Sequence, residues 1–267
     1  MDFKFFSKNG EIVPIERAVV PLSNIEYQYG FGVYENIRVA NSVPLFLSEH
    51  LERLENSAKI LGLEHPFDAT VSANVDLLVK KIGSGTYNLK ILLIGGAEPL
   101  LYIIPLNPHF VDKKLYRDGV HLITYPYERP FPHAKSLNML QSYLAYKKAK
   151  EAGAYDALLT NKENCITEGT RTNFFTIKGR TLYSPSEKDI LLGVTRAAVL
   201  GVALAIGFDV EDAEIRPENL AGCDGAFITS TSSKILPVRS VDHMQLKEAP
   251  AALRELMAAF DRSLEAN

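Results

Sequence analysis

Two prolines, Pro105 and Pro108, interrupt the pattern of the chain and divide it into two parts. Proline lacks a backbone N–H and restricts the residue before it, so a regular helix or a central strand does not continue through this stretch. On either side, short apolar runs alternate with segments whose apolar residues recur at helical spacing. We therefore predict two α+β domains: residues 1–106 and residues 113–267, joined by a linker at 107–112.

The first part is predicted to mix strand hairpins with two helices. Asn9-Gly10 suits the turn of an opening hairpin. Ser48 is a suitable N-cap for a helix over residues 49–61, and Gly62 is a suitable residue to end that helix. A second helix is expected over residues 69–82.

The second part is predicted to alternate strands with helices over residues 137–150, 195–206 and 250–264. In the first of these helices, four residues share the expected inward face: Leu137, Leu140, Leu144 and Ala145. Gly153 is expected to stop this helix.

The composition favours a globular protein and makes disorder unlikely. Hydrophobic residues make up 46% of the chain, which is enough for a sizeable core. A net charge of -3 from 29 basic and 32 acidic residues, with no basic run, argues against a nucleic-acid surface. The longest apolar stretch, 91–96, is far too short to span a membrane. Two cysteines are few for a secreted scaffold and indicate a reduced, cytoplasmic setting.

Three stretches of the second part have the residue types that a pyridoxal-phosphate (PLP) cofactor requires. Lys135 offers an amine for the aldehyde of the cofactor. Glu168 offers a carboxylate that can keep the pyridine nitrogen protonated and so strengthen the electron sink. Gly193 stands directly before a predicted helix, whose first N–H groups suit a phosphate dianion.

Six motifs, in one order, resemble those of the class IV aminotransferases, the PLP fold type IV family, which includes branched-chain and D-amino-acid aminotransferases and aminodeoxychorismate lyase. The resemblance covers about residues 26–241. The motifs are Tyr29-Gly30-Phe31-Gly32-Val33-Tyr34-Glu35-Asn36-Ile37-Arg38, Glu49-His50-Leu51-Glu52-Arg53-Leu54, Lys135-Ser136-Leu137-Asn138, Thr167-Glu168-Gly169-Thr170-Arg171-Thr172-Asn173, Leu191-Leu192-Gly193-Val194-Thr195-Arg196 and Thr229-Ser230-Thr231.

The resemblance implies a two-domain α+β fold, with a small N-terminal α/β domain and a larger pseudo-barrel domain that binds PLP. It implies a homodimer in which the partner subunit completes the substrate pocket. It also assigns the cofactor residues: Lys135 resembles the lysine of the Schiff base, Glu168 the carboxylate at the pyridine nitrogen and Arg53 the phosphate arginine. The other residues that it places at the cofactor are Leu191, Val194, Thr195, Ser230 and Thr231.

The resemblance also indicates where substrate binds. Tyr29 and Tyr34 correspond to pocket aromatics, and Lys90 falls where relatives often have a cation near the substrate carboxylate. Arg38 and Arg171 are further candidates, since arginine offers a bidentate fork to a carboxylate. No metal ligand is predicted.

We predict an aminotransferase that passes an amino group from an amino acid to a 2-oxo acid such as 2-oxoglutarate, with a branched-chain-like L-amino acid favoured as the donor. A D-amino-acid aminotransferase and an aminodeoxychorismate lyase are the alternatives. The Asn138-Met139 pair is closer to the D-amino-acid enzymes and the lyase, whereas Tyr34-Glu35-Asn36-Ile37-Arg38 favours the branched-chain enzymes. Asn36 argues against the lyase, which usually has threonine there.

Overall fold

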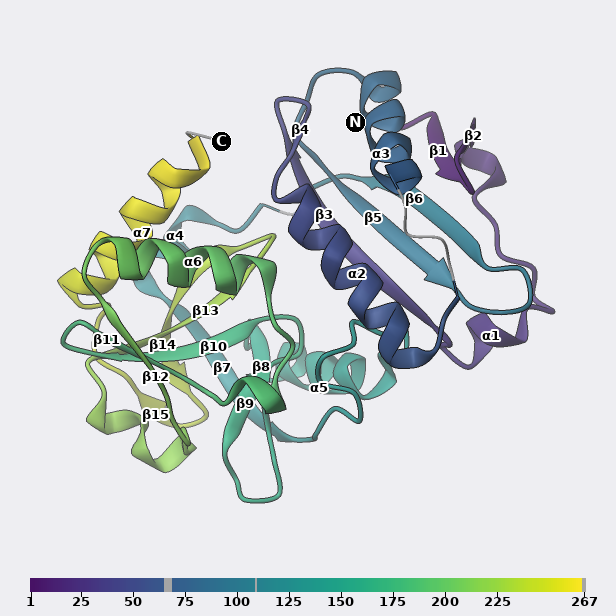
Figure 1. Ribbon diagram of the computed structural model, residues 1–267. Helices are drawn as coiled ribbons and strands as arrows, with labels where there is room; N and C mark the ends of the chain where they lie inside the picture. Colours follow the sequence, from purple (N-terminus) through teal and green to yellow (C-terminus); the bar gives the residue numbers. More distant parts are fainter. Residues whose placement is uncertain (65–68, 109, 266–267) are drawn as a thin grey trace. The chain divides into compact units, whose positions relative to one another are not determined.

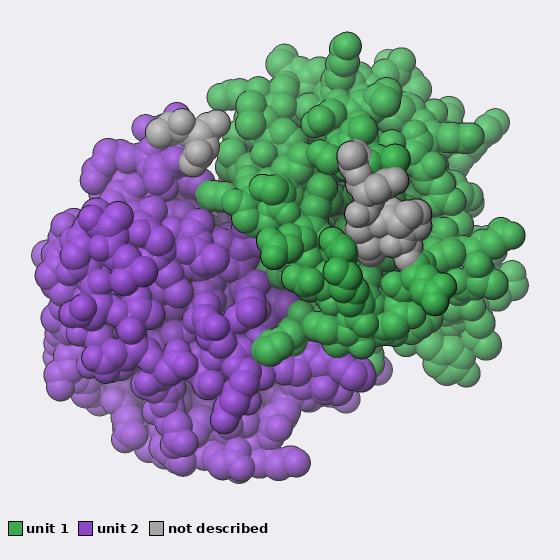
Figure 2. Space-filling model, viewed as in Figure 1, with its two compact units in different colours: residues 1–109, 133–139 green, residues 110–132, 140–267 purple. Residues whose placement is uncertain are grey.

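A computed structural model describes residues 1–64, 69–108 and 110–265 (Figure 1). The chain forms two compact units (Figure 2). Unit 1 comprises Met1–His109 and His133–Met139, and unit 2 comprises Phe110–Pro132 and Leu140–Asn267. The segment 133–139, which the predicted second domain included, thus belongs to the first unit.

Unit 1 is built on an antiparallel sheet whose strands lie in the order β2-β1-β6-β5-β3-β4. The strands are β1 (Phe5–Lys8), β2 (Glu11–Pro14), β3 (Gly32–Ala40), β4 (Val43–Pro44), β5 (Tyr87–Ile94) and β6 (Leu100–Leu106). The helices are α1 (Ile25–Gln28), α2 (Leu47–Leu61) and α3 (Ala69–Ile82), with a short 3-10 turn at Ile15–Arg17. The opening hairpin turns at Asn9-Gly10 as predicted.

Helices α2 and α3 cover one face of this sheet (Figure 1). Leu54 of α2 and Val75 of α3 are fully buried against Ile37, Leu89 and Ile91 of the central strands. Because side chains alternate along a strand, the residues between these point to the other face.

The ends of α2 agree only in part with the sequence. Gly62 caps its C-terminus in the left-handed region (φ 68°), as predicted. The predicted N-cap, Ser48, was wrong: α2 begins at Leu47, and Phe46 precedes it with a φ of 54°. The Ser48 hydroxyl instead donates to Glu49, at 2.8 Å.

Unit 2 is built on a sheet in the order β12-β11-β10-β13-β14-β7-β8-β9, in which β9 also pairs with β10. The strands are β7 (Val120–Pro126), β8 (Asp156–Thr160), β9 (Ile166–Gly169), β10 (Asn173–Lys178), β11 (Thr181–Ser184), β12 (Asp209–Asp212), β13 (Gly225–Ser230), β14 (Lys234–Val241) and β15 (Met244–Gln245). The β9–β10 pairing closes β10, β13, β14, β7, β8 and β9 into a ring. This barrel-like sheet confirms the predicted fold class.

The ring has an apolar interior and helices on its outside. Side chains from all of its strands fill the interior, among them Leu122, Leu158, Phe174 and Ile228. The helices of unit 2 are α4 (Lys113–Asp118), α5 (Leu140–Glu151), α6 (Val194–Ala205) and α7 (Ala251–Glu265), with 3-10 turns at Glu187–Asp189 and Pro217–Gly222. Helices α6 and α7 lie side by side on the outer face of β10 and β13, and α5 packs on β8 (Figure 1).

The start and inward face of α5 differ from the prediction. The helix begins at Leu140 rather than at Leu137, because Leu137 lies in an extended segment that hydrogen-bonds to Gly32 of unit 1. Ala145 is buried as predicted, but Leu140 and Leu144 are 65% and 40% exposed. Among the residues that the structure describes, no helix is long and apolar enough to cross a membrane.

A buried charged cluster ties α2 to β3. The Glu35 carboxylate is fully buried and receives Arg53 through two contacts, Nε–Oε1 at 2.6 Å and Nη2–Oε2 at 2.8 Å. His50 Nδ1 lies 2.8 Å from Glu35 Oε2. Burial alone would raise the pKa of Glu35, but the Arg53 charge and the hydrogen bonds from His50 and Arg53 outweigh it and lower the pKa to about 2.

Replacing Glu35 with glutamine is expected to lower the free energy of unfolding by roughly 3 kcal/mol at neutral pH, because a largely buried guanidinium would face a neutral amide. The depressed pKa makes this contribution complete above the unfolded-state value near 4.5, and it is lost as the pH falls towards 2. Urea unfolding at several pH values measures both effects. Glu55→Gln, which breaks an exposed pair with Lys59, is the control and should cost less than about 0.5 kcal/mol. Equal losses in the two variants would contradict the expectation.

Candidate functional site

Lys135 is held by its backbone against the start of β3. Its carbonyl accepts the N–H of Tyr34 at 2.9 Å, and its own N–H donates to Ser57 Oγ of α2 at 3.1 Å. The N–H of Leu137 donates to the carbonyl of Gly32 at 2.8 Å. This stretch therefore extends the sheet of unit 1 along the edge of β3, and strand alternation sets the side to which Lys135 points.

Lys135 shares a face of the sheet with two of the predicted substrate residues. Its Nζ lies 4.6 Å from the centre of the Tyr34 ring, and Lys90 Nζ lies 5.6 Å from the same centre. In the pairing of β3 with β5, Asn36 lies opposite Lys90. Arg38 comes two residues after Asn36 on β3 and therefore lies on the same face. The face opposite to α2 and α3 thus combines an aromatic ring with cations.

Ser57 connects Lys135 to Arg53. Its hydroxyl donates to the carbonyl of Arg53 at 2.7 Å and accepts the N–H of Lys135. The Arg53 side chain is 12% exposed and its orientation is set by Glu35. Tyr29 follows α1 and is 76% exposed, so the described contacts do not bring it into this group.

Glu168 of unit 2 lies where β9 departs from regular pairing. Thr160 is opposite Ile166, but Leu158 is opposite Gly169, so β9 holds one extra residue between these pairs. Such a bulge re-aims side chains. Ile166 fills the ring interior, whereas Glu168 pairs with Asn173 on the outer side.

The Glu168 carboxylate is buried but has a counter-charge. Arg129 Nε lies 2.9 Å from its Oε1, and the N–H of Leu191 donates to its Oε2 at 3.3 Å. Arg129 also donates to the carbonyl of Thr170 at 3.1 Å. These contacts fix the orientation of the buried carboxylate.

Asp156, at the start of β8, anchors the turn that follows Glu168. The fully buried Asp156 accepts the hydroxyls of Thr170 and Thr172. Burial raises the pKa of the Asp156 carboxyl, against the lowering effect of these hydroxyls and of the Arg171 charge. A Cβ on Gly169 would collide with Thr172 Oγ1, so this turn requires glycine. Arg171 itself is exposed and stacks on the Tyr146 ring of α5, at 4.3 Å.

The first N–H groups of α6 have no intrahelical carbonyl to bond to. The N-cap residue, Gly193, has no side chain that could cap them, and the first turn holds no acidic residue. Val194 and Thr195 are buried at this end. The helix dipole and these N–H groups favour an anion here.

The end of β13 adds hydroxyls to unit 2. Thr229 pairs with Asn173 and so lies on the side of the sheet that Glu168 occupies. Its buried Oγ1 has no hydrogen-bond partner among the residues that the structure describes. Ser230 Oγ lies 2.7 Å from Ser233 Oγ, and Thr231 follows, partly exposed. The donors at α6 and β13 fit a phosphate monoester, and Glu168 fits a protonated ring nitrogen, so the residues present suit PLP.

The structure thus groups the predicted residues within each unit. Six come from unit 1: Lys135, Arg53, Tyr29, Tyr34, Arg38 and Lys90. The others come from unit 2: Glu168, Leu191, Val194, Thr195, Ser230, Thr231 and Arg171.

Sequence reasoning assigned no role to Ser57, Arg129 or Asn173. Ser57 and Arg129 lie outside the quoted motifs, and their contacts join residues that are distant in the chain. Asn173 belongs to a quoted motif, and that motif is the one signal that could have drawn attention to it.

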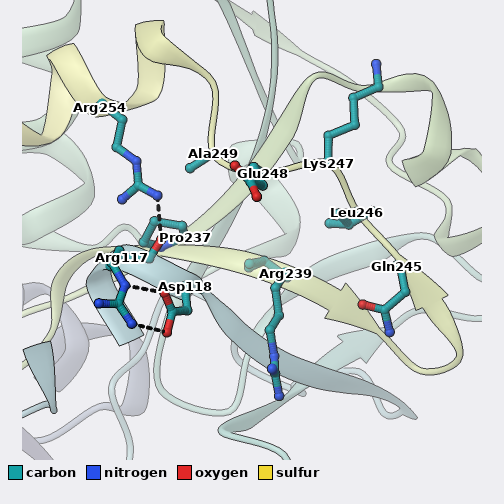
Figure 3. Close-up of a pocket in the computed structure, with 12 residues that line it drawn as sticks. Arg117, Asp118, Pro237, Arg239, Gln245, Leu246, Lys247, Glu248, Ala249 and Arg254 are labelled. Carbon is teal, nitrogen blue, oxygen red and sulfur yellow. Dashed lines mark hydrogen bonds and ion pairs between the residues drawn. The ribbon is translucent and has the colours of Figure 1, made fainter. Parts of the chain in front are cut away.

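A pocket of about 440 Å³ lies elsewhere in unit 2, between α4, β14 and the start of α7 (Figure 3). Three of its cations are engaged: Arg117 pairs with Asp118, Lys247 pairs with Asp224, and Arg254 donates to the carbonyls of Tyr116 and Arg117. None of the predicted site residues lines it. It is therefore not a candidate for the cofactor site.

Comparison with known proteins agrees with the geometry. The family described as amino-transferase class IV matches residues 32–241. The D-alanine aminotransferase of Bacillus licheniformis is 31% identical over 96% of this chain and 95% of its own length. The putative branched-chain-amino-acid aminotransferase of Methanocaldococcus jannaschii is 31% identical over 92% of this chain and 93% of its own length.

Among solved structures, the T.th. branched-chain amino acid aminotransferase with pyridoxamine 5'-phosphate superposes with a TM-score of 0.91 at 26% identity, over 100% of this chain and 95% of the other. These proteins share the reaction type that their names state, and the family uses PLP. The family match covers most of the chain, and the chain therefore belongs to the class IV aminotransferases, enzymes that depend on pyridoxal phosphate.

Proposed function

We propose that this aminotransferase takes the amino group of a branched-chain-like L-amino acid and passes it to a 2-oxo acid such as 2-oxoglutarate, with Lys135 as its reactive lysine. The observation that carries the proposal is the face of unit 1 that Lys135 shares with Tyr34 and Lys90. That face offers an amine, an apolar ring and a cation to one small substrate.

When bound, PLP supplies an electron sink for the bond that breaks at the substrate Cα. The residues of the chain bind and orient the cofactor and move the proton. Lys135 Nζ is the group that we assign to move the Cα proton. Its backbone is anchored on both sides, so the amine can turn about its own side chain while its base stays in place.

Glu168 is assigned to hold a proton at the pyridine nitrogen. Its carboxylate is oriented by Arg129 and by the N–H of Leu191, which keeps it an acceptor. The N–H groups of Val194 and Thr195 at the start of α6, together with the hydroxyls after β13, are assigned to the phosphate. Arg53 is the arginine that the family resemblance places at the phosphate.

The substrate preference rests on charge and surface. Lys90 and Arg38 are cations on the same sheet face as Lys135, and a cation there suits the carboxylate of an amino acid. The Tyr34 ring suits an apolar side chain. A complex of the T.th. branched-chain enzyme with N-(5'-phosphopyridoxyl)-L-glutamate supports an L-configured donor and 2-oxoglutarate as acceptor. Arg171 stays a second candidate for a carboxylate.

A D-amino-acid donor is the second candidate function. The likeness to the D-alanine aminotransferase of Bacillus licheniformis, at 31% identity, favours it as much as the putative branched-chain relative favours the first.

A homodimer is part of the proposal. Between Val19 and Phe31, unit 1 exposes a run of apolar and aromatic side chains: Val19, Leu22, Ile25, Tyr27, Tyr29 and Phe31. Leu22 is 94% exposed. An apolar strip of this kind is typical of a surface that a second chain covers, and Tyr29, a predicted pocket residue, lies within it. A reduced, cytoplasmic setting is also proposed, supported by Cys165 and Cys223 as free thiols.

Lys135→Ala is expected to lower the rate of L-glutamate formation from L-leucine and 2-oxoglutarate on the order of 10³-fold or more, because the amine that moves the proton is gone. The circular dichroism spectrum and the melting temperature should stay close to those of the wild type. Lys59→Ala removes an exposed lysine of the same unit and is the matched control. A Lys135→Ala enzyme that transaminates at the wild-type rate would show that the lysine is wrongly assigned.

The donor is tested by adding one amino acid at a time to the cofactor-loaded enzyme without a 2-oxo acid. We expect L-leucine to bleach the visible absorption band of the bound cofactor, and D-alanine to do so roughly 100-fold more slowly. Bleaching by D-alanine alone would assign the chain to the D-amino-acid enzymes. A band that neither amino acid changes would contradict both donors, and no band after PLP is added would contradict the cofactor assignment.

Leu22→Lys is expected to weaken the dimer at least about tenfold, because association would bury a charged side chain. Sedimentation velocity over a range of protein concentrations measures the change. Leu77→Lys alters an exposed leucine of α3, outside the strip, and should leave the dimer intact. A monomeric wild type, or equal behaviour of the two variants, would argue against this interface.

A further inference from the structure

One amide side chain contacts two residues of the short segment that leads from the 3-10 turn at Glu187–Asp189 into α6. Asn173 Nδ2 donates to the carbonyl of Leu191 at 2.8 Å. The N–H of the same Leu191 donates to Glu168 Oε2 at 3.3 Å. The backbone N–H and the backbone carbonyl of Leu191 are therefore both hydrogen-bonded, one to Glu168 and the other to Asn173. These two partners are neighbours, because Asn173 lies opposite Glu168 in the β9–β10 pairing.

The oxygen of this amide lies against Gly193, the N-cap of α6. A Cβ on Gly193 would collide with Asn173 Oδ1. The φ of Gly193 is -68°, which any residue adopts, so glycine is needed here for contact with the amide and not for its backbone freedom. Asn173 thus touches Leu191 and Gly193 and stands beside Glu168.

We propose that Asn173 is a positioning residue that sets the spacing between the Glu168 carboxylate and the N-terminus of α6. The proposal rests on the proposed function, in which these two groups bind the ring nitrogen and the phosphate of the cofactor. The Asn173 side chain is buried, its amide nitrogen donates to the carbonyl of Leu191, and its amide oxygen lies against Gly193. A change at this position is expected to make the distance between the two binding groups variable, while the chain keeps both groups.

The physical consequence is a chelate effect. Two binding groups at a fixed separation hold a ligand that carries both complementary groups far more tightly than its separate halves, because the second contact is made at a high effective concentration. If the separation becomes variable, the joined ligand loses affinity and the halves do not. Comparing the affinity of the whole ligand with the affinities of its two halves therefore shows whether the distance between Glu168 and the N-terminus of α6 is fixed.

The experiment uses the cofactor-free enzyme and three probes: pyridoxamine 5'-phosphate, pyridoxamine and inorganic phosphate. The amine forms carry no aldehyde, so their binding includes no covalent step at Lys135. We expect Asn173→Ala to weaken pyridoxamine 5'-phosphate roughly tenfold, the effect of one lost hydrogen bond, and to change the two half-ligands by less than about twofold. Titration calorimetry, with competition for the weak probes, gives the three dissociation constants.

Equal weakening of all three probes would show a merely structural role and overturn the proposal, as would no change in any of them. Asn173→Leu roughly keeps the size of the side chain and removes the donor without adding a charge, so it serves if the alanine variant fails to fold, and circular dichroism identifies that case. Thr176→Val, a buried change on the same strand, is the packing control and should leave the three constants unaltered.

A second arm tests the contact with Gly193. Gly193→Ala would place a methyl group where the amide oxygen lies, so it should weaken pyridoxamine 5'-phosphate about as much as Asn173→Ala does. The double variant should bind pyridoxamine 5'-phosphate no more weakly than either single variant, because both changes disrupt the same contact between the Asn173 amide and Gly193. If the fold-change in the dissociation constant of the double variant equals the product of the two single fold-changes, the two residues act separately and the proposal is overturned.

The proposed function fails in a different way. If wild-type enzyme binds pyridoxamine 5'-phosphate no more tightly than pyridoxamine, the phosphate assignment itself is wrong. A strong wild-type preference that Asn173→Ala leaves unaltered overturns only the role of Asn173.

Discussion

The pairing of β9 with β10, Glu168 opposite Asn173, is the constraint on which the chemistry of unit 2 depends. It closes the ring of strands, and a closed ring leaves no free edge at that point. It also places a carboxylate and an amide side by side on the outer face, next to the segment that begins α6. The same pairing therefore completes the barrel and assembles its polar site.

Closure at this point requires a tight turn between the two strands, and buried polar groups stabilise it. Gly169 leaves room for the Thr172 hydroxyl, and Asp156 holds the hydroxyls on either side of Arg171. Arg129 connects the Glu168 side chain with the carbonyl of Thr170. These contacts satisfy groups that would otherwise be costly to bury.

Both units bury a carboxylate beside an arginine: Glu35 with Arg53 in unit 1 and Glu168 with Arg129 in unit 2. Such pairs add little net stability, because desolvation offsets the Coulombic gain. They do fix geometry, since an arginine fork and a carboxylate match only in a few orientations. In each unit the pair holds a residue that the family resemblance assigns to the cofactor.

Sequence patterns predicted the local features and missed the non-local ones. Gly62 ends α2 because a left-handed residue is a local requirement. Ser48 failed as a cap because the chain enters α2 through Phe46 in a left-handed turn, which composition does not signal. Leu137 fitted a helical period, yet its N–H pairs with Gly32, a residue far away in the chain. The roles that we propose for Lys135 and Glu168 came from the family motifs, and periodicity indicated neither role.

Register, more than side-chain contact, decides where the amine of Lys135 points. Ser136 lies opposite Val33, so Lys135 and Leu137 face one side of the sheet and Ser136 the other. A slip of one residue would turn Lys135 to the face that α2 and α3 cover. Two features resist such a slip: the hydroxyl of Ser57 binds the N–H of Lys135, and Gly32, whose Cβ would lie 2.6 Å from Leu137 Cδ1, leaves room for that leucine. The amine is thus aimed by backbone pairing and by one leucine that fits against a glycine.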